Sequence, residues 1–312
     1  DGLVISKLDG AMLSDMQRGG LTAANCTCSV WEDFQGTMRN IAQIKRLISN
    51  NKDKAIQIYS TDDIDIAKRE GKVGIILGWQ NSSGIDTNLD YVAVFAELGL
   101  RIVQLTYNTA NYAGCGCYET VDRGLTDFGR DLVDELGANR ILIDLSHVGP
   151  VTSRDVVEHA RGPFAITHCC PSALKQHQRN KSDEEIRHVI DKGGFVGVAG
   201  VPHFLPGGID SSVDDFARAI AHIVDVAGED HVGIGTDITQ GYGPDFYEWI
   251  ALDKGNGRRL TSFADAPILR GFESLDQYPN IVAALDRAGM SSRVVEKVMG
   301  INWYNFLRTS WN

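Results

Sequence analysis

Two histidines stand at the ends of consecutive apolar segments, where a parallel sheet would bring them together. His147 ends the segment 140–147, and His168 ends the segment 164–168. Imidazole is the commonest zinc ligand, and neighbouring strands of a barrel place side chains at their carboxyl ends within coordination reach. The pair therefore indicates either a metal site or two hydrogen-bonded core histidines, and the residue types alone leave both open.

Two charged residues with complementary chemistry follow similar segments. Asp237 lies near the end of the segment 232–238, where it can act as a catalytic acid or base or, in a structural role, cap the following loop. Arg179, next to Asn180, lies in a loop after His168, and a guanidinium is a natural bidentate clamp for a carboxylate. We expect Arg179 and Asn180 to bind substrate, with a surface ion pair as the alternative.

Short segments rich in Val and Ile alternate with helix-length amphipathic stretches, which predicts βα units around a parallel sheet. The segments are 3–6, 21–28, 73–80, 101–108, 140–147, 164–168, 195–201 and 232–238. Eight of them predict a closed (β/α)8 TIM barrel, an α/β fold that would occupy residues 1–312 as a single domain. A further segment, 55–59, lies between two helical stretches and is interpreted as an insertion.

The pattern after the last strand predicts two additions to the barrel. Residues 240–280 contain many glycines and prolines, and an irregular stretch at this place is typical of a lid or entrance loop. A helix over residues 291–307 is predicted to close the chain. Residues 213–227 carry one apolar stripe at helical spacing, which indicates a helix that covers the sheet.

Composition narrows the possible partners. The 312 residues include 30 Lys and Arg against 41 Asp and Glu, a formal charge of −11, which disfavours nucleic-acid binding. Apolar runs of membrane-spanning length and a signal-peptide pattern are both absent from the sequence, so we expect a cytoplasmic protein with no membrane partner. The six cysteines form three close pairs without C-x-x-C spacing, which disfavours a disulfide scaffold and a structural zinc site.

Four stretches together resemble the renal, or membrane, dipeptidase family of zinc hydrolases. They read LIDLSHV (142–148), ITH (166–168), HQRN (177–180) and HVGIGTD (231–237), and residues 1–2, 70–72 and 124–129 match in the same order. The resemblance covers essentially the full chain. It implies an amidohydrolase-like (β/α)8 barrel, usually a homodimer, that hydrolyses dipeptides with two zinc ions bridged by a hydroxide and a carboxylate.

Some of the family's functional positions are present in this sequence. By the resemblance, His147 and His168 would be ligands of one zinc, and Arg179 would bind the substrate carboxylate. Asp237 would handle the proton that passes to the leaving amine. These assignments agree with the chemistry that the residue types suggest on their own.

Other family positions are changed. The family's first strand normally ends Asp-Gly-His-x-Asp and supplies two ligands of the other zinc, but Leu3 and Ile5 stand at those two places. Gln80 replaces the bridging Glu, and Tyr107 replaces the histidine that polarises the scissile carbonyl. Without the two carboxylates, neutral ligands could not hold two dications close together, so we predict at most one zinc ion.

A single zinc needs a third ligand besides the two histidines. Gln80, Asp237, Cys26 and Cys28 are the candidates, and three protein ligands plus water would still make a hydrolytic site. Gln80 and Tyr107 are also predicted to contact the substrate, and Tyr107 is a candidate acid or base.

Three functions remain open on the sequence. The first is a metal-dependent, dipeptidase-like hydrolase that cleaves a dipeptide or small amide bearing a free carboxylate. The second is an enzyme of the same fold with altered chemistry, such as a cyclic or modified amino-acid amide hydrolase or a lyase. The third is a catalytically inactive homologue that binds a small ligand.

Overall fold

The computed structural model describes residues 1–261 and 268–311. Its strands are β1 (Ala23–Ser29), β2 (Ala55–Gln57), β3 (Val73–Trp79), β4 (Leu100–Gln104), β5 (Leu142–Asp144), β6 (Phe164–Cys169), β7 (Val196–Val198) and β8 (Val232–Ile234). Seven of them form a parallel sheet in the order β1-β3-β4-β5-β6-β7-β8. These strands are almost wholly buried on both faces, which explains their continuous apolar sequences.

The first predicted strand closes the barrel. Residues 2–5 lie between β1 and the segment after β8: Val4 bridges both Cys26 and Ile238. Backbone hydrogen bonds run from Val4 N–H to the Asn25 carbonyl at 2.8 Å and from Ile5 N–H to the Ile238 carbonyl at 3.1 Å. All eight predicted strand segments therefore take part in the barrel, and the prediction of an α/β barrel is confirmed.

The segment 55–59, interpreted as an insertion, contains the extra strand β2. It pairs with residues 73–75 of β3, whereas β4 pairs with residues 77–79 of the same strand. The additional strand therefore extends one edge of β3 at its amino end and leaves the carboxyl end of the barrel unchanged.

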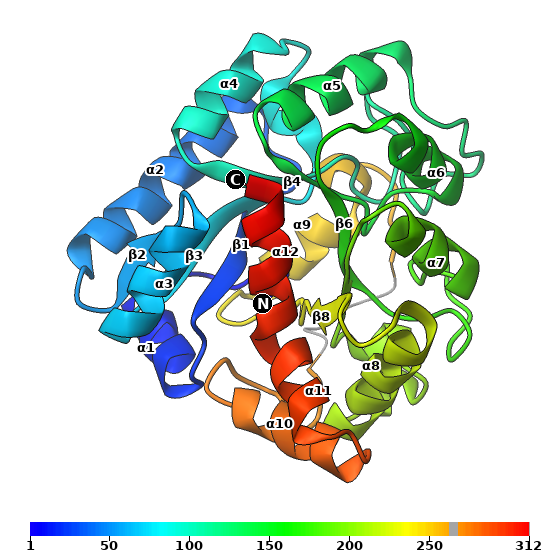
Figure 1. Cartoon of the computed structure of the whole chain (residues 1–312). Coiled ribbons are helices and arrows are strands. Elements are labelled where there is room, and N and C mark those ends of the chain that lie inside the picture. The colour runs from blue at the N-terminus through cyan, green and yellow to red at the C-terminus, as the bar shows by residue number, and fades with distance from the viewer. Residues whose placement is uncertain (262–267, 312) are drawn as a thin grey trace.

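Helices surround the barrel, and two of those in the following list, α9 and α12, lie over its ends (Figure 1). They are α1 (Gly10–Arg18), α2 (Phe34–Asn50), α3 (Thr61–Glu70), α4 (Asp90–Glu97), α5 (Asp127–Ala138), α6 (Pro150–His159), α7 (Asp183–Asp191), α8 (Val213–Ala227), α9 (Pro244–Ala251), α10 (Tyr278–Arg287), α11 (Ser292–Glu296) and α12 (Asn302–Trp311). Helix α8 has the predicted bounds and starts with a capping box between Ser212 and Asp215. Among the helices that the structure describes, none is long and apolar enough to cross a membrane.

The carboxyl-terminal part of the chain differs from the prediction. The helix expected over 291–307 is divided into α11 and α12 by a π-helical turn over Lys297–Ile301. Helix α12 lies across one end of the barrel (Figure 1), where the Trp303 indole donates to the Ile234 carbonyl. A Cβ on Gly233 would come within 2.5 Å of the Trp303 ring, so glycine is required for this close packing.

The predicted lid over 240–280 is partly helical. It contains α9 and, after residues 262–267 that lie outside the described part of the chain, the start of α10 at Tyr278. Proline in the first turn supports α9, since its fixed backbone angle suits a helix start. The sequence predicted the place of this segment but not its helix.

Candidate functional site

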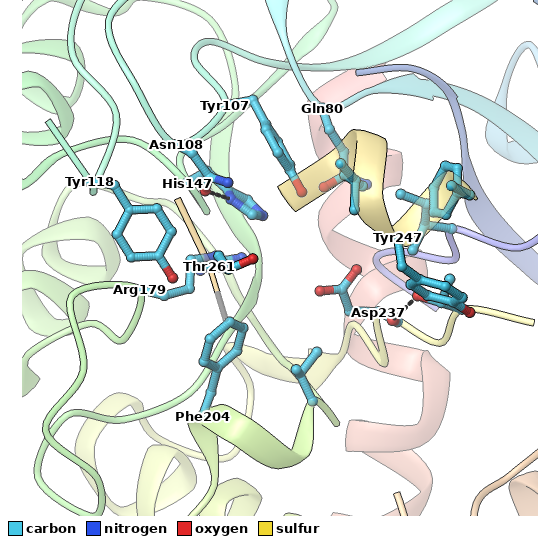
Figure 2. Close-up of a pocket in the computed structure, with 15 residues that line it drawn as sticks. Gln80, Tyr107, Asn108, Tyr118, His147, Arg179, Phe204, Asp237, Tyr247 and Thr261 are labelled. Carbon is cyan, nitrogen blue, oxygen red and sulfur yellow. Dashed lines mark hydrogen bonds between the residues drawn. The ribbon is translucent and has the colours of Figure 1, made fainter. Parts of the chain in front are cut away.

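A pocket opens at the carboxyl ends of the strands, where the active sites of (β/α)8 barrels lie. Figure 2 shows Arg179, Tyr118 and Phe204 on one side of it, and Gln80 and Tyr247 on the other. Its lining consists of Ile5, Gln80, Tyr107, Asn108, Tyr118, His147, Arg179, Val201, Phe204, Asp237, Thr239, Phe246, Tyr247, Ile250 and Thr261.

The two predicted histidines meet beside this pocket. The Nε2 atoms of His147 and His168 lie 3.1 Å apart, and both rings are buried. The opposite nitrogens are occupied: His147 Nδ1 lies 2.7 Å from Asn108 Oδ1, and His168 Nδ1 lies 2.7 Å from Thr167 Oγ1. Burial, together with the nearby charge of Arg179, holds the pKa of both imidazoles well below the usual range, so both are neutral.

Hydrogen bonding fixes which nitrogen of each ring carries the proton. Thr167 Oγ1 donates to Asp144 at 2.6 Å, so it accepts from His168 Nδ1. The Asn108 carbonyl oxygen can only accept, so His147 Nδ1 is also protonated. Both Nε2 atoms then present lone pairs to each other, an arrangement that a shared cation would stabilise.

The histidine pair fits one metal ion. Two nitrogens about 3.1 Å apart match adjacent ligands at the usual zinc–nitrogen distance of about 2.0–2.1 Å. Within the described ranges, however, no group of three His, Cys, Asp or Glu side chains is arranged to hold a metal. The third ligand would therefore come from a group such as the Gln80 amide, from water, or from movement of Asp237.

The cysteine candidates for that third ligand are placed elsewhere. Cys26 and Cys28 are buried in the core and are not among the pocket-lining residues. The Cys28 thiol donates to the Gly78 carbonyl at 3.3 Å, and burial raises the pKa of Cys26 to about 12. Both thiols are therefore protonated near neutral pH, and neither of these two candidates lines the pocket.

Arg179 is a buried cation that has no matching anion among the residues the structure describes. Arg179 is only 1% exposed. Its guanidinium donates hydrogen bonds to the carbonyls of Ser146 and His168, each at 2.7 Å. The Phe204 ring lies 5.8 Å from the guanidinium carbon. No carboxylate of the described residues is within ion-pair distance, and the buried Nε has no hydrogen-bond partner. An anionic ligand would supply the missing charge.

Asp237 lies at the floor of the pocket, after the end of β8. Burial raises its pKa to about 7, although the charge of Arg179 opposes the shift. Its backbone has a φ of 57°, and Asn108 at the end of β4 has a φ of 59°. Left-handed conformations are uncommon outside glycine and concentrate at functional sites, so both residues are held in place by their surroundings.

Tyr107 and Gln80 reach the pocket as predicted, but Asn180 does not. The Tyr107 ring stacks on His147 with centroids 4.3 Å apart, and burial raises the pKa of its hydroxyl. Gln80 donates to Thr27 Oγ1 at 3.0 Å. The Asn180 amide instead donates to the carbonyls of Lys175 and Phe204, so it holds the loop around Arg179.

The apolar part of the lining was not predicted from the sequence. It consists of Ile5, Val201, Phe204, Phe246 and Ile250, together with the ring of Tyr247. The clustered aromatic residues at 246–249 were a usable signal, but the surrounding glycines and prolines concealed their helix.

Comparison with known proteins places the chain in a family. Residues 10–247 match the sequence model of the membrane dipeptidase family, peptidase family M19. The chain belongs to this family. An amidohydrolase from Pseudomonas aeruginosa is 50% identical, with a TM-score of 0.97 over 100% of this chain and 95% of that one. The resemblance seen in the sequence is thus confirmed.

Curated relatives are more distant. An uncharacterized dipeptidase of Schizosaccharomyces pombe is 27% identical over 274 residues, which are 85% of this chain and 60% of the relative. A dipeptidase of Claviceps purpurea is 25% identical over 88% of this chain and 60% of its own length. The chain therefore spans about 60% of the length of these two relatives.

Proposed function

We propose that this chain is a metal-dependent, dipeptidase-like hydrolase that cleaves a dipeptide or another small amide bearing a free carboxylate. The observation that carries the proposal is a pocket lined by Arg179, which has no carboxylate partner among the described residues, and by His147, whose Nε2 atom converges with that of His168 beside the pocket. Membership of the membrane dipeptidase family supports the same reaction class. We also propose that the functional unit is a homodimer, which light scattering of the purified protein tests.

The proposed roles follow from the placement of each side chain. His147 and His168 would hold a single zinc ion, which when bound supplies Lewis acidity and lowers the pKa of water. Arg179 binds the substrate carboxylate and thereby sets the position of the amide. Tyr107, whose hydroxyl stays protonated near neutral pH, donates a hydrogen bond to the amide carbonyl.

Asp237 is the proposed proton carrier. A carboxyl group with a pKa of about 7 can both accept and donate a proton near neutral pH. Its carboxylate takes the proton from the attacking water and gives it to the leaving nitrogen. The water oxygen then bonds to the carbonyl carbon and the C–N bond breaks, which yields a carboxylic acid and an amine.

Metal content and turnover test this function together. We expect about one zinc per chain by elemental analysis of protein purified without chelator, and hydrolysis of a set of dipeptides and acyl amino acids. His147→Ala should lose both, because one imidazole alone holds zinc weakly. His231→Ala, at an exposed histidine outside the pocket, is the matched control and should keep both. Activity of His147→Ala without bound metal would sink the proposal.

A second function is favoured by the missing third ligand. The described residues do not provide three metal-binding side chains in one cluster, so a same-fold enzyme that uses Tyr107 and Asp237 without zinc is the alternative. It predicts unchanged turnover in the presence of a strong chelator. The hydrolase proposed above predicts that the chelator abolishes turnover and that added zinc restores it.

A further inference from the structure

One wall of the pocket is apolar and lies away from Arg179. Ile5 packs in one cluster with Val30 and Tyr107, and three residues of α9 cover that cluster: Phe246, Trp249 and Ile250. Tyr247, on the same helix, faces the pocket from the side opposite Arg179 and Tyr118 (Figure 2). The pocket therefore has a cationic side and an apolar side.

The apolar wall stands where the resemblance places a metal ligand. Ile5 is 5% exposed and lines the pocket through its side chain. Its backbone N–H donates to the Ile238 carbonyl, which fixes the main chain of Ile5 within the closed barrel. A position that would be polar in a two-zinc site is thus part of a continuous apolar surface.

Charge decides which chemical group this wall accepts. Asp237 is the one carboxylate among the described pocket-lining residues, and the proposed reaction uses it for proton transfer. The side chains of Ile5 and Ile250 offer no hydrogen-bond acceptor, so a free ammonium placed directly against them would lose water without compensation, which is costly. An alkyl or aryl group at the same place would be stabilised by burial.

We propose that the amide carries an uncharged, apolar acyl group on the side away from Arg179, so that the substrate is an N-acyl amino acid with an apolar acyl chain and Ile5, Phe246 and Ile250 set this preference. The inference rests on the proposed function and narrows its substrate. Water adds its hydroxyl to the acyl carbon and its proton to the amino acid nitrogen, which releases an apolar carboxylic acid and a free amino acid.

Ketone analogues that cannot be hydrolysed test this preference by calorimetric titration. In these ligands a CH₂ replaces the amide NH. The ligand 4-oxopentanoate corresponds to N-acetylglycine, and 4-oxononanoate, with four more methylenes, to N-hexanoylglycine. We expect the longer chain to bind more tightly by about fourfold per methylene that becomes buried.

A second pair of ligands separates an apolar group from an ammonium. The ligand 4-oxohexanoate ends in a methyl group where 5-amino-4-oxopentanoate, the analogue of glycylglycine, carries an ammonium. We expect the ammonium ligand to bind at least about tenfold more weakly, because its desolvation is not compensated on the apolar wall. Equal or tighter binding of the ammonium ligand would overturn the inference in favour of free dipeptides.

Variants of the wall identify the residues responsible. Ile5→Thr and Ile250→Thr should each reduce the preference for 4-oxononanoate over 4-oxopentanoate by about three- to tenfold. Val30→Thr is the matched control, since Val30 belongs to the same cluster but does not line the pocket, and its preference should be unchanged. An unchanged preference in both pocket variants would contradict the assignment of the wall.

Failure of the inference differs from failure of the proposed function. If all four ligands bind with similar affinity, the carboxylate site stands and the apolar preference is wrong. If none of them binds, the carboxylate clamp at Arg179 is wrong, and the proposed function falls with it.

Discussion

The two halves of the barrel mouth are built in opposite ways. Around β5 and β6, Asp144, Thr167 and His168 form a buried network in which successive polar groups are hydrogen-bonded to one another. Around the segment 2–5, Ile5 makes an apolar wall with Phe246 and Ile250 of α9. Buried polar groups are stable only with a full set of partners, whereas an apolar wall requires only close packing. The polar half thus fixes the positions of the histidine side chains, and the apolar half determines which ligand groups the pocket accepts.

The hydrogen bonds that hold the histidine pair do not depend on the apolar side of the barrel mouth. The histidine pair depends on Asn108 and on the Asp144 network, and none of its hydrogen bonds involves Leu3 or Ile5. Gln80, where the family has a bridging carboxylate, donates to Thr27 instead. Changes in one half therefore leave the partners in the other half intact.

The largest loss of stability is expected when Asp144, the shared acceptor of the polar half, is removed. Asp144 accepts hydrogen bonds from both the backbone N–H and the hydroxyl of Ser146 and of Thr167. Asp144→Ala should lower the free energy of unfolding by about 3–5 kcal/mol, because four buried donors lose their acceptor. Denaturant unfolding measures it. A loss below about 1 kcal/mol would show that the network is not held by this carboxylate.

A smaller effect is expected from the residue that orients His147. Asn108→Gly removes the acceptor for His147 Nδ1 and suits the left-handed backbone, so the fold should be unharmed. Zinc affinity should fall by about 10–100-fold, measured by competition with a chelator. Asn108→Asp keeps an acceptor and should retain the affinity. Equal affinities of the two variants would mean that this hydrogen bond does not position the ring.

The apolar half should respond more weakly and less evenly. Ile5→Thr places a hydroxyl where it can reach pocket water, so we expect a loss of about 1 kcal/mol in the free energy of unfolding. Val30→Thr buries its hydroxyl in the core and should cost about 2 kcal/mol. Urea unfolding of both proteins ranks them. A larger loss for Ile5→Thr than for Val30→Thr would indicate that Ile5, not Val30, is the position closed off from water.

The comparison also explains what the sequence could predict. Strand segments and their ends are encoded locally by Val- and Ile-rich runs, so the barrel and the placing of His147 and His168 followed from the pattern. Arg179 could be selected by its chemistry. Its neighbour Asn180 looked equally suitable, but the direction of an amide side chain depends on the Lys175 and Phe204 carbonyls, which no local pattern reveals.

The apolar wall was beyond sequence reasoning for a different reason. Ile5 and α9 are separated by more than 200 residues, and only barrel closure brings them together. Cys26 and Cys28 were candidates for the third zinc ligand because they stand near the end of their strand, yet their side chains are buried in the core. Adjacent residues of a strand point to opposite faces, so a shift of one position decides the outcome.

The smallest effect is expected at the opposite end of the barrel, where β8 begins. Lys297 pairs with Glu229 at 2.9 Å and with Asp230. Its hydrogen bonds lower the pKa of both carboxyl groups, and the carboxylates in turn raise the pKa of Lys297. The pairs are partly exposed to solvent, so Lys297→Gln should lower the Tm by only ~1–2 °C at neutral pH, with ligand affinity unchanged.

The loss of Tm in Lys297→Gln should depend on pH in a definite direction. Carboxyl groups with lowered pKa values stabilise the fold above their ordinary pKa values of 3.8 and 4.5, and the contribution disappears as the pH falls through the lowered values. The raised pKa of Lys297 keeps its contribution complete up to its ordinary pKa of 10.5. The Tm difference should therefore be constant between about pH 5 and 10 and vanish in strong acid.

Lys52→Gln, at a lysine without an ion pair in the described structure, should show no such difference. A Tm difference that persisted in acid would assign the effect of Lys297 to packing of its side chain and not to its charge.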